Sequence, residues 1–574
     1  MKVLFAFFTD PPRPFSSSVA ALAAVVRDAG HAPEALEIDR KSAIDDARDA
    51  IEQAAPDVLA VSAMSRDWPG ARALVERLDP APYVVVGGYH ASMAPRDVAA
   101  CAAVDAIGIG EGERPLRALL AALERGERPA RSRPGLWVRG PAGFADPVPS
   151  GDPEPDIAAL PRWDYEVFGD VHTGLARGLN TFGPHVDRFL PTRASRGCPF
   201  ACAYCSAPRW GKTAGFEAAG TRNTRPVAEL CDELADLRDR YAPEGFEFWD
   251  EHFPVRLAWL RELAREYPRR VGLPFKVEMH PNAASRERLE LLVEAGCVLF
   301  HCGVEAGDEA LRRDVLNRRT RDTRLQQLFD DARELGLETS ASLMTALPGE
   351  TRAQTVETVE LLRKLRPGSF MWSTYQPLPG TPLGDAAVAE WPGPARERFD
   401  DYEKIRSRTP ARLTEAERNA AFHDLNALQA SRVADASARA DAPAPPRPVE
   451  VPAARPPAPD ALARLLGLAP PAAPLSARVR VNTATWEAGA LSIELEARGL
   501  APRRVDIGPR DGARCYASTD RLALSYRGGE APARLLEALD ALAERLAPLG
   551  VEDLRGALDA SRGHAPAEAT RVPR

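Results

Sequence analysis

Lysine is nearly missing from this 574-residue sequence, which has only six lysines among its 74 basic residues. The 82 acidic residues leave a net charge of −8, so no global basic field indicates a nucleic acid or an anionic membrane as a partner. No stretch of eighteen apolar residues is present, which argues against a membrane-spanning helix. The apolar run at residues 3–8 is too short for a secretory signal, and none is expected.

Cysteine is scarce as well, with eight residues in the whole chain. Three of them, Cys198, Cys202 and Cys205, lie within eight residues of one another. That spacing suits a metal centre in a reducing compartment better than a disulfide framework. We therefore expect a cytoplasmic protein.

The length predicts about two to four domains. Residues 1–125 alternate short apolar runs with helical patterns, which predicts a Rossmann-like, doubly wound parallel sheet with ligands at the C-terminal strand ends. Strands are expected at residues 3–8, 57–62, 83–86 and 106–108, and helices at residues 19–30, 69–78 and 115–125.

A loop-rich connector is expected at residues 126–189, and β/α alternation resumes at residues 190–382. Six β/α units predict a partial (β/α)6 barrel, open on one side, with its chemistry at the C-terminal face. The six strands are expected at residues 190–195, 245–250, 274–280, 298–305, 337–345 and 369–376. The overall fold class is therefore α/β.

The remaining residues divide by composition. Residues 383–440 are expected to form a helical extension, and residues 441–475 a linker rich in proline and alanine, with eleven prolines between Pro443 and Pro474. A small α+β domain of unknown role is predicted at residues 476–562. It has no lysine and no aromatic stacking pattern, so RNA binding is not expected.

The three clustered cysteines form a C-x3-C-x2-C pattern directly after the first barrel strand. A structural zinc site needs four ligands in two paired knuckles, and no second pair follows. Three thiolates on one loop instead suit a [4Fe–4S] cluster whose fourth iron stays open to a further ligand.

The motif, with Tyr204 before its third cysteine and a barrel after it, resembles the radical S-adenosylmethionine (SAM) superfamily. This resemblance implies that Cys198, Cys202 and Cys205 hold the cluster and that SAM chelates the fourth iron. It also implies that Tyr204 belongs to the SAM site.

Four further positions resemble SAM-site elements of that superfamily. Glu305 follows the fourth strand in a G-x-E-S-G-like element in which Ala306 replaces the serine, and Arg318 resembles the base that pairs with the SAM carboxylate. Arg319 is an alternative, and both arginines could simply be charges at a helix end. Ser342 would face SAM, whereas Asp250 would either reach SAM or order a loop.

Doubly wound domains that precede radical SAM barrels resemble cobalamin-binding domains. The residues expected to contact cobalamin lie in three loops: Ser62, Ser65, Arg66, Gly87, Gly88, Gly110, Glu111 and Gly112. Glycines there let the backbone approach the ligand. The D-x-H-x-x-G element that supplies a histidine to cobalt is missing, and a degenerate domain that binds nothing is the alternative.

The resemblance implies a cobalamin-dependent radical SAM enzyme, most simply a methyltransferase that moves a methyl group from methylcobalamin to an unactivated carbon of a natural-product type substrate. Cyclisation, ring contraction or another rearrangement without methyl transfer is the alternative. A binding protein without turnover is disfavoured by the intact cysteine motif. RNA methylthiotransferases carry three more cluster cysteines in their N-terminal domain, where this chain has only Cys101.

The expected partners are a small-molecule or peptide/carrier-bound substrate and a flavodoxin- or ferredoxin-type electron donor, with no nucleic acid and no membrane. No catalytic side chain is assigned from the sequence.

Overall fold

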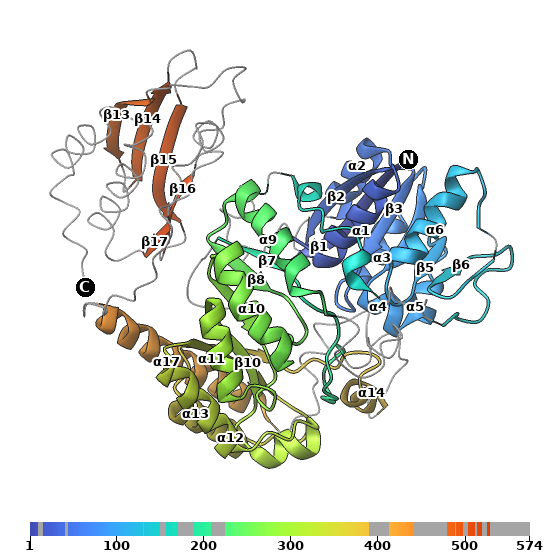
Figure 1. Cartoon of the computed structure of the whole chain (residues 1–574). Helices are drawn as coiled ribbons and strands as arrows, with labels where there is room; N and C mark the ends of the chain where they lie inside the picture. Colours follow the sequence, from blue (N-terminus) through green and yellow to red (C-terminus); the bar gives the residue numbers. More distant parts are fainter. Residues whose placement is uncertain are drawn as a thin grey trace. The chain divides into compact units, whose positions relative to one another are not determined.

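The computed structural model describes residues 1–9, 15–40, 44–129, 131–149, 156–169, 171, 188–207, 224–389 and 413–440, together with five strands between residues 479 and 527. The chain divides into two compact units, Met1–Pro445 and Pro446–Arg574, and each is described by itself (Figure 1). The predicted linker at residues 441–475 lies outside the described residues, as do the residues beyond 527.

The first sheet has six strands in the order β2-β1-β3-β4-β5-β6, and only β6 runs antiparallel to its neighbour. Its strands are β1 (Lys2–Thr9), β2 (Ala32–Asp39), β3 (Val58–Ser62), β4 (Tyr83–Gly87), β5 (Ala106–Gly108) and β6 (Leu136–Val138). Its helices are α1 (Ser17–Asp28), α2 (Ile44–Ala54), α3 (Trp68–Val75), α4 (Tyr89–Met93), α5 (Pro95–Ala99) and α6 (Glu113–Glu124). The predicted doubly wound sheet is confirmed.

Strand β1 explains how this sheet carries a helix layer on each face. Successive side chains of a strand point to opposite faces. Phe5 and Phe7 belong to a core with residues of α1 and α6, whereas Leu4 and Ala6 belong to a second core with residues of α2 and α3. A strand buried on both faces reads as a continuous apolar run, which is why the sequence pattern reveals it.

The sequence analysis predicts none of five elements of this sheet domain: strands β2 and β6 and helices α2, α4 and α5. Strand β2 is an edge strand whose residues are partly exposed and include Pro33 and Glu34. Because its composition is mixed, β2 lacks the apolar run of a central strand. Helix α2, which follows β2, is not predicted either. Strand β6 lies within the residues assigned to the connector and pairs with β5.

The second sheet is fully parallel, in the order β12-β11-β10-β9-β8-β7. Its strands are β7 (Phe189–Thr192), β8 (Gly245–Phe248), β9 (Phe275–Glu278), β10 (Cys297–Glu305), β11 (Glu338–Thr345) and β12 (Ser369–Thr374). The helices between them are α9 (Val227–Tyr241), α10 (Leu257–Arg270), α11 (Arg286–Ala295), η3 (Leu311–Val315), α12 (Asp322–Glu334) and α13 (Arg352–Leu365). This is the predicted partial barrel, and all six predicted strands are present.

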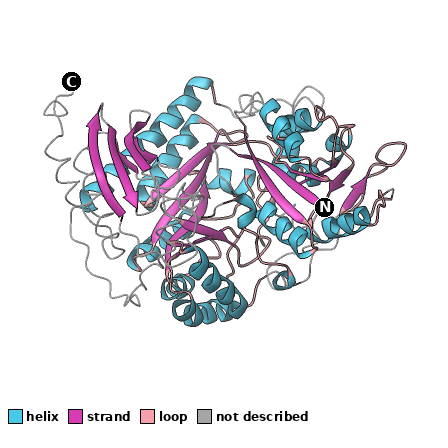
Figure 2. Ribbon diagram, turned by 90° about the horizontal axis from the view of Figure 1, so that it is seen from above, coloured by secondary structure: helices cyan, strands magenta, loops and turns pink. Residues whose placement is uncertain are grey.

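The helices line the outer side of this half-barrel, where they cover the curved sheet (Figures 1 and 2). The largest apolar core of the described residues lies between them and includes Phe246, Phe275 and Phe300 on three neighbouring strands. Because parallel strands end at one edge, the loops after β7, β8, β9, β10 and β11 gather at the same face of the half-barrel.

The N-cap of α13 is Thr351, whose backbone N–H donates to the side chain of Gln354 at 2.9 Å. Two helices follow the barrel, α14 (Pro382–Ala389) and α17 (Glu415–Ala440). No helix among the described residues is long and apolar enough to cross a membrane.

The second unit contains an antiparallel sheet in the order β13-β14-β15-β16-β17. Its strands are β13 (Val479–Glu487), β14 (Ala490–Ala497), β15 (Arg503–Arg510), β16 (Arg514–Ser518) and β17 (Ser525–Arg527). The sequence predicts strands near residues 477–484, 490–497, 504–507 and 521–526, which overlap β13, β14, β15 and β17, but it predicts none at β16. A helix that the sequence predicts at residues 531–546 lies outside the described residues.

Candidate functional site

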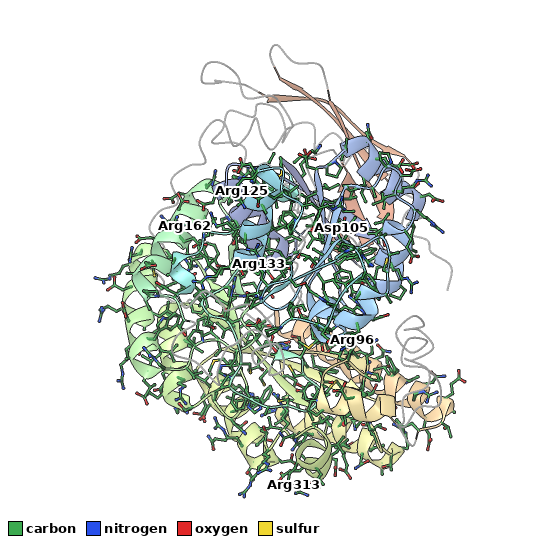
Figure 3. The ribbon with its side chains drawn as sticks, turned by 90° about the vertical axis from the view of Figure 1, so that its right-hand side faces the viewer. Arg96, Asp105, Arg125, Arg133, Arg162 and Arg313 are labelled. Carbon is green, nitrogen blue, oxygen red and sulfur yellow. The ribbon has the colours of Figure 1, made fainter. Side chains whose placement is uncertain are left out.

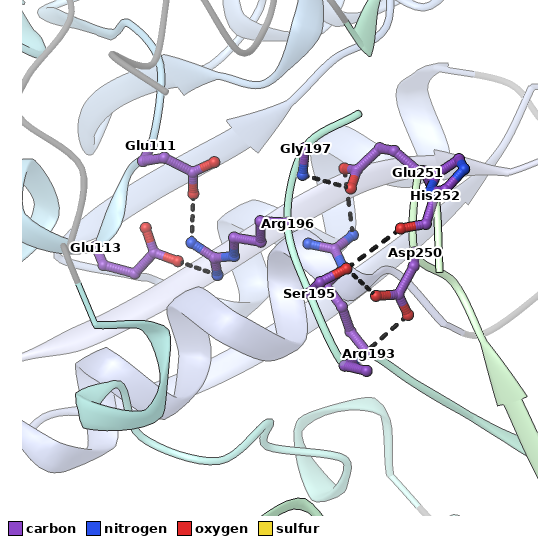
Figure 4. A network of polar contacts seen from close by, with 10 residues as sticks. Glu111, Glu113, Arg193, Ser195, Arg196, Gly197, Asp250, Glu251 and His252 are labelled. Carbon is purple, nitrogen blue, oxygen red and sulfur yellow. Dashed lines mark hydrogen bonds and ion pairs between the residues drawn. The ribbon is translucent and has the colours of Figure 1, made fainter. Parts of the chain in front are cut away.

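The three clustered cysteines lie on the loop that leaves β7 at the C-terminal edge of the half-barrel. This segment, residues 193–205, is called the cluster loop. Asp250 fixes its start, because the carboxylate accepts hydrogen bonds from the Ala194 N–H at 3.1 Å and the Ser195 hydroxyl at 2.5 Å (Figure 4). Burial raises the pKa of Asp250 to about 7, against the lowering effect of these hydrogen bonds. Of the two roles weighed for Asp250, this geometry favours the ordering of a loop.

The chemistry of the cysteines fits an iron–sulfur cluster. Burial raises the pKa of the Cys198 thiol to about 11 and that of Cys205 to about 12, so a strong cation is needed to hold them as thiolates. Among the described residues, no three His, Cys, Asp or Glu side chains surround a point where a single ion could sit. A [4Fe–4S] cluster does not require such a point, because each cysteine binds a different iron.

Tyr204, Glu305 and Arg318 meet beside the cluster loop, as the resemblance implies. The Tyr204 hydroxyl donates to Glu305 Oε1 at 2.7 Å and accepts from Arg318 Nη1 at 3.2 Å. Arg318 Nη1 also lies 3.5 Å from the Cys202 sulfur and 3.8 Å from Glu305 Oε1. A carboxylate and a guanidinium side by side can bind the charged amino and carboxyl groups of an amino acid.

Burial dominates the electrostatics of this group. It raises the pKa of Glu305, while Arg318 and the Tyr204 hydroxyl oppose the shift. It also raises the pKa of Tyr204 well above its ordinary value. A zwitterionic ligand would bring its own charges to these side chains and offset the cost of burying them.

Two loops present these side chains, and Arg312 joins them. Its fully buried guanidinium donates to the carbonyls of Ala306 at 2.6 Å, Gly307 at 2.9 Å and Thr320 at 3.2 Å, and it pairs with Asp322. Ala306 and Gly307 directly follow Glu305, and Thr320 lies two residues beyond Arg318. Glu305 itself has a φ of 71°, a conformation that a non-glycine residue keeps only when its surroundings hold it.

Ser342 lies on the neighbouring strand β11, where its hydroxyl is 2.6 Å from His301 Nε2. Burial lowers the pKa of His301 to about 4, so this imidazole is neutral near pH 7. His301 also borders a cavity of about 170 Å³ whose other lining residues come mainly from β8 and β9. Its charged lining residues are Glu247, Asp250, Glu251, Lys276 and Glu278.

The cluster loop packs against two histidines at the ends of β8 and β9. The Phe200 ring stacks on His280 with centroids 3.7 Å apart, and it lies 5.3 Å from the ring of His252. Burial lowers the pKa of His252 to about 4 and that of His280 to about 2, so both rings are neutral near pH 7. The stack supports the part of the loop between Cys198 and Cys202.

The glycines predicted to contact cobalamin differ in their surroundings. Gly88 has a φ of 90°, and a Cβ there would come within 3.1 Å of the Ala63 backbone and 3.3 Å of the Ser62 hydroxyl. Gly87, at the end of β4, has no atom within 4 Å of its Cβ position. Such open space at a C-terminal strand end fits the close approach of a ligand to the backbone.

The loop after β3 is tied to His90. Ser65 is buried, and its hydroxyl lies 3.2 Å from His90 Nδ1, while His90 Nε2 lies 3.0 Å from Asp97. The His90 ring is fully buried and stacks on Trp68. Both ring nitrogens are therefore engaged within the domain. Arg66 is exposed beside this loop.

The third predicted cobalamin loop, Gly110, Glu111 and Gly112, faces protein on two sides. The Gly110 N–H donates to the Ser92 hydroxyl at 3.0 Å, and a Cβ on Gly112 would come within 3.1 Å of the Leu22 side chain. Glu111 pairs with Arg196 of the cluster loop at 2.5 Å. The loop thus contacts the half-barrel directly.

The loop after β12, residues 377–382, contacts both parts of the site. The Tyr89 hydroxyl of α4 donates to the Pro379 carbonyl at 2.8 Å, and a Cβ on Gly380 would come within 2.9 Å of the Met93 sulfur. Beyond the loop, the Leu383 N–H donates to the carbonyl of Ala203 in the cluster loop. The two sheets therefore meet around the cluster loop.

Sequence analysis missed Arg196, Arg312 and the histidine pair. Arginine is so common here that no single one stands out, and nothing in the spacing marks a buried guanidinium. Arg196 offered one signal, since it is two residues from a metal-binding motif.

Comparison with known families agrees with this arrangement. Residues 15–120 match the family model of the B12 binding domain, and residues 192–362 match that of the radical SAM superfamily. The chain therefore carries a radical SAM domain preceded by a B12-binding domain. A radical SAM domain implies a [4Fe–4S] cluster and SAM, and a B12-binding domain implies cobalamin.

Individual relatives are more distant. The chain is 29% identical over 307 residues to the anaerobic magnesium-protoporphyrin IX monomethyl ester cyclase of Cereibacter sphaeroides, covering 52% of this chain and 47% of that protein. It is 25% identical over 320 residues to an uncharacterized methyltransferase of Pyrococcus horikoshii, covering 54% and 63%. The chain thus spans about half to three fifths of the length of these relatives.

Among solved structures, the chain resembles the radical SAM methyltransferase TsrM of Kitasatospora setae with cobalamin and the cluster bound. The TM-score is 0.54 at 20% identity, over 68% of this chain and 78% of that one. At this identity the likeness concerns the fold.

Proposed function

We propose that this protein is a cobalamin-dependent radical SAM enzyme that transfers a methyl group to an unactivated carbon of its substrate. The single observation that carries the proposal is the meeting of the cluster loop with the predicted cobalamin loops, through the pairing of Arg196 with Glu111. When bound, the cluster supplies the electron that cleaves SAM, and cobalamin supplies the methyl group.

The chain's own residues have separable tasks in this proposal. Cys198, Cys202 and Cys205 hold the cluster, and Glu305 and Arg318 orient the charged groups of SAM beside it. Tyr204 positions the side chains of Glu305 and Arg318 relative to each other through two hydrogen bonds. Gly87 and Gly88 let the backbone of the first sheet approach cobalamin. Ser62, Ser65, Arg66 and Ser342 remain predicted contacts.

The cavity beside His301 is the proposed place of the substrate. Its size, about 170 Å³, suits a small molecule or one side chain of a larger one. A peptide or carrier-bound substrate and an electron donor of the flavodoxin or ferredoxin type remain part of the proposal, as does a cytoplasmic location. A cyclisation is the second candidate, because a curated relative is a cyclase.

The test begins with the full chain purified without oxygen, reconstituted with iron, sulfide and hydroxocobalamin, and then desalted. We expect about four irons and about one corrinoid per chain. Cys205→Ala should lose iron, whereas the matched variant Cys231→Ala, which alters a buried thiol on α9, should keep it. Iron without retained corrinoid would refute a cobalamin-dependent function.

The second measurement separates the two candidates. With labelled SAM, a reductant and candidate substrates, methylation forms S-adenosylhomocysteine together with 5′-deoxyadenosine. Formation of 5′-deoxyadenosine with a modified but unlabelled product would support the rearrangement instead.

A further inference from the structure

A buried ion cluster joins the two halves of the proposed active site. Arg196 Nη1 lies 2.5 Å from Glu111, and its Nη2 lies 2.6 Å from Glu113 (Figure 4). Arg196 belongs to the cluster loop, and the two glutamates belong to the turn that opens α6 in the first sheet domain. We refer to Arg196, Glu111 and Glu113 as the arginine clamp.

The clamp is withdrawn from solvent. The exposed fractions of the three side chains are 9%, 14% and 8% for Arg196, Glu111 and Glu113. Burial alone would raise the pKa of Glu113, but the charge and hydrogen bond of Arg196 lower it below its ordinary value. Glu113 is therefore ionised near pH 7. One guanidinium contacts both carboxylates, because its planar fork matches two acceptors at once.

The arginine clamp is connected to both cofactor loops through neighbouring residues of the chain and through hydrogen bonds. On one side, Arg196 is two residues from Cys198, and the Gly197 N–H between them donates to Glu251 at 3.1 Å. On the other side, the Gly110 N–H beside Glu111 donates to the Ser92 hydroxyl, which donates to the Gly88 carbonyl at 3.1 Å. Gly88 is a predicted cobalamin contact.

We propose that Arg196 is a positioning residue that couples the two cofactor loops, so that the cluster and cobalamin each bind more tightly when the other is present. This inference rests on the proposed function, since it requires both cofactors. Loading the cluster fixes Cys198 and hence the backbone that carries Arg196. The fixed guanidinium then holds Glu111 and Glu113 in place, and with them the turn that supports Gly88.

Such coupling is reciprocal. If the cluster raises the affinity for cobalamin by some factor, cobalamin raises the affinity for the cluster by the same factor. Couplings of this kind are typically about five-fold or larger. A ratio of two dissociation constants for cobalamin therefore measures the coupling directly.

The test uses the full chain, before and after anaerobic reconstitution with iron and sulfide, with hydroxocobalamin as the probe. The dissociation constant of hydroxocobalamin is measured in both forms, and the reduced cluster is followed by electron paramagnetic resonance. We expect the wild-type chain to bind hydroxocobalamin about five-fold or more tightly in the reconstituted form. In Arg196→Gln the ratio of the two constants should fall below half of the wild-type value.

Three variants complete the design. Arg196→Gln/Glu111→Gln/Glu113→Gln removes the clamp without leaving unpaired buried charge, so it tests the coupling even if Arg196→Gln fails to fold. Arg196→Lys retains a charge that reaches one carboxylate and should recover part of the ratio. The control is Arg270→Gln, which breaks an Arg–Asp pair with Asp232 between α10 and α9 of the half-barrel, neither of which belongs to the cluster loop. It should leave the ratio unchanged.

The outcomes distinguish a failure of the proposed function from a failure of this inference alone. A wild-type chain that retains no corrinoid overturns the proposed function and this inference together. A wild-type chain that binds both cofactors with a ratio near one overturns the inference alone. The same holds if the triple variant keeps more than half of the wild-type ratio, or if Arg270→Gln lowers the ratio as much as Arg196→Gln does.

Discussion

Arg312 and Arg313 are neighbours in η3 with opposite surroundings, and they allow a matched test of what holds the SAM site together. Arg312 is fully buried and donates to three carbonyls and to Asp322. Arg313 is half exposed, at the lower edge of Figure 3, and pairs only with Asp314 among its hydrogen-bond and ion-pair partners in the described residues. We predict that Arg312→Met is strongly destabilising and that Arg313→Met is nearly neutral.

The size of the effect follows from the partners left behind. Removing one member of a buried charged network typically costs about 3–5 kcal/mol, because the remaining polar groups stay buried without a donor. The expected loss of stability is smaller than the sum of the four contacts, because methionine also removes the cost of burying the guanidinium and fills part of its volume. An exposed pair such as Arg313–Asp314 contributes at most about 1 kcal/mol.

The assay is thermal unfolding of the full chain, followed by circular dichroism, with both variants beside the wild type. For a large domain, a loss of about 3–5 kcal/mol corresponds to a fall in Tm of about 5–10 °C. The affinity for SAM should fall as well, because Glu305 and Arg318 lie on the two loops that Arg312 joins. Equal Tm values for Arg312→Met and Arg313→Met would refute the reasoning.

Three further predictions concern single positions. Gly87→Ala should leave Tm unchanged yet weaken hydroxocobalamin binding, whereas Gly88→Ala should lower Tm as well. The reason is that, of the two, only Gly88 has a positive φ and close backbone neighbours. Equal Tm losses in the two variants would contradict this. Tyr204→Phe should keep the iron content but raise the dissociation constant of SAM several-fold. The control is Tyr241→Phe at the end of α9, which removes a hydroxyl that donates to Glu166; an unchanged SAM affinity in Tyr204→Phe would argue against the prediction. Burial raises the pKa of Glu350 from 4.5 to about 7, so the folded chain holds a proton that the unfolded chain has lost, and Tm should fall as pH rises through that interval. Glu350→Gln should reduce this fall and exposed Glu360→Gln should not; parallel Tm–pH curves for Glu350→Gln and wild type would rule the explanation out.

The sequence predicted well those parts of the fold whose strands are buried on both faces. The central strands of the first sheet show continuous apolar runs. The half-barrel strands β8, β9 and β11 contain Glu247, Lys276 and Ser340, and the β/α alternation rather than an apolar run reveals them. The edge strand β2 has no such run, because exposed edges tolerate polar residues and proline, and β6 is apolar but only three residues long.

The residues of the candidate site differ in whether a local sequence pattern reveals them. Cys198, Cys202 and Cys205 follow from their spacing, and Glu305 and Arg318 from their places after strands and helices. Arg196 and Arg312 act through contacts between segments far apart in the chain, which no local pattern encodes. Glu111 shows the difference most clearly, because its glycine-rich turn indicates a ligand loop, while the structure pairs its carboxylate with Arg196.

The cavity beside His301 also offers a chemical route to the substrate. Guanidinium groups do not react with amine-directed reagents under mild conditions, so labelling of this arginine-rich chain is restricted to the amino terminus and six lysines. One of these, Lys276, lines the cavity, with its ammonium group 4.5 Å from the centre of the Phe189 ring. Lys276 is only 4% exposed, so its basal modification is slow. A further slowing in the presence of a candidate compound, read by mass spectrometry, would report occupancy of the cavity without any turnover. A compound library could thus be screened against the cofactor-free chain in air.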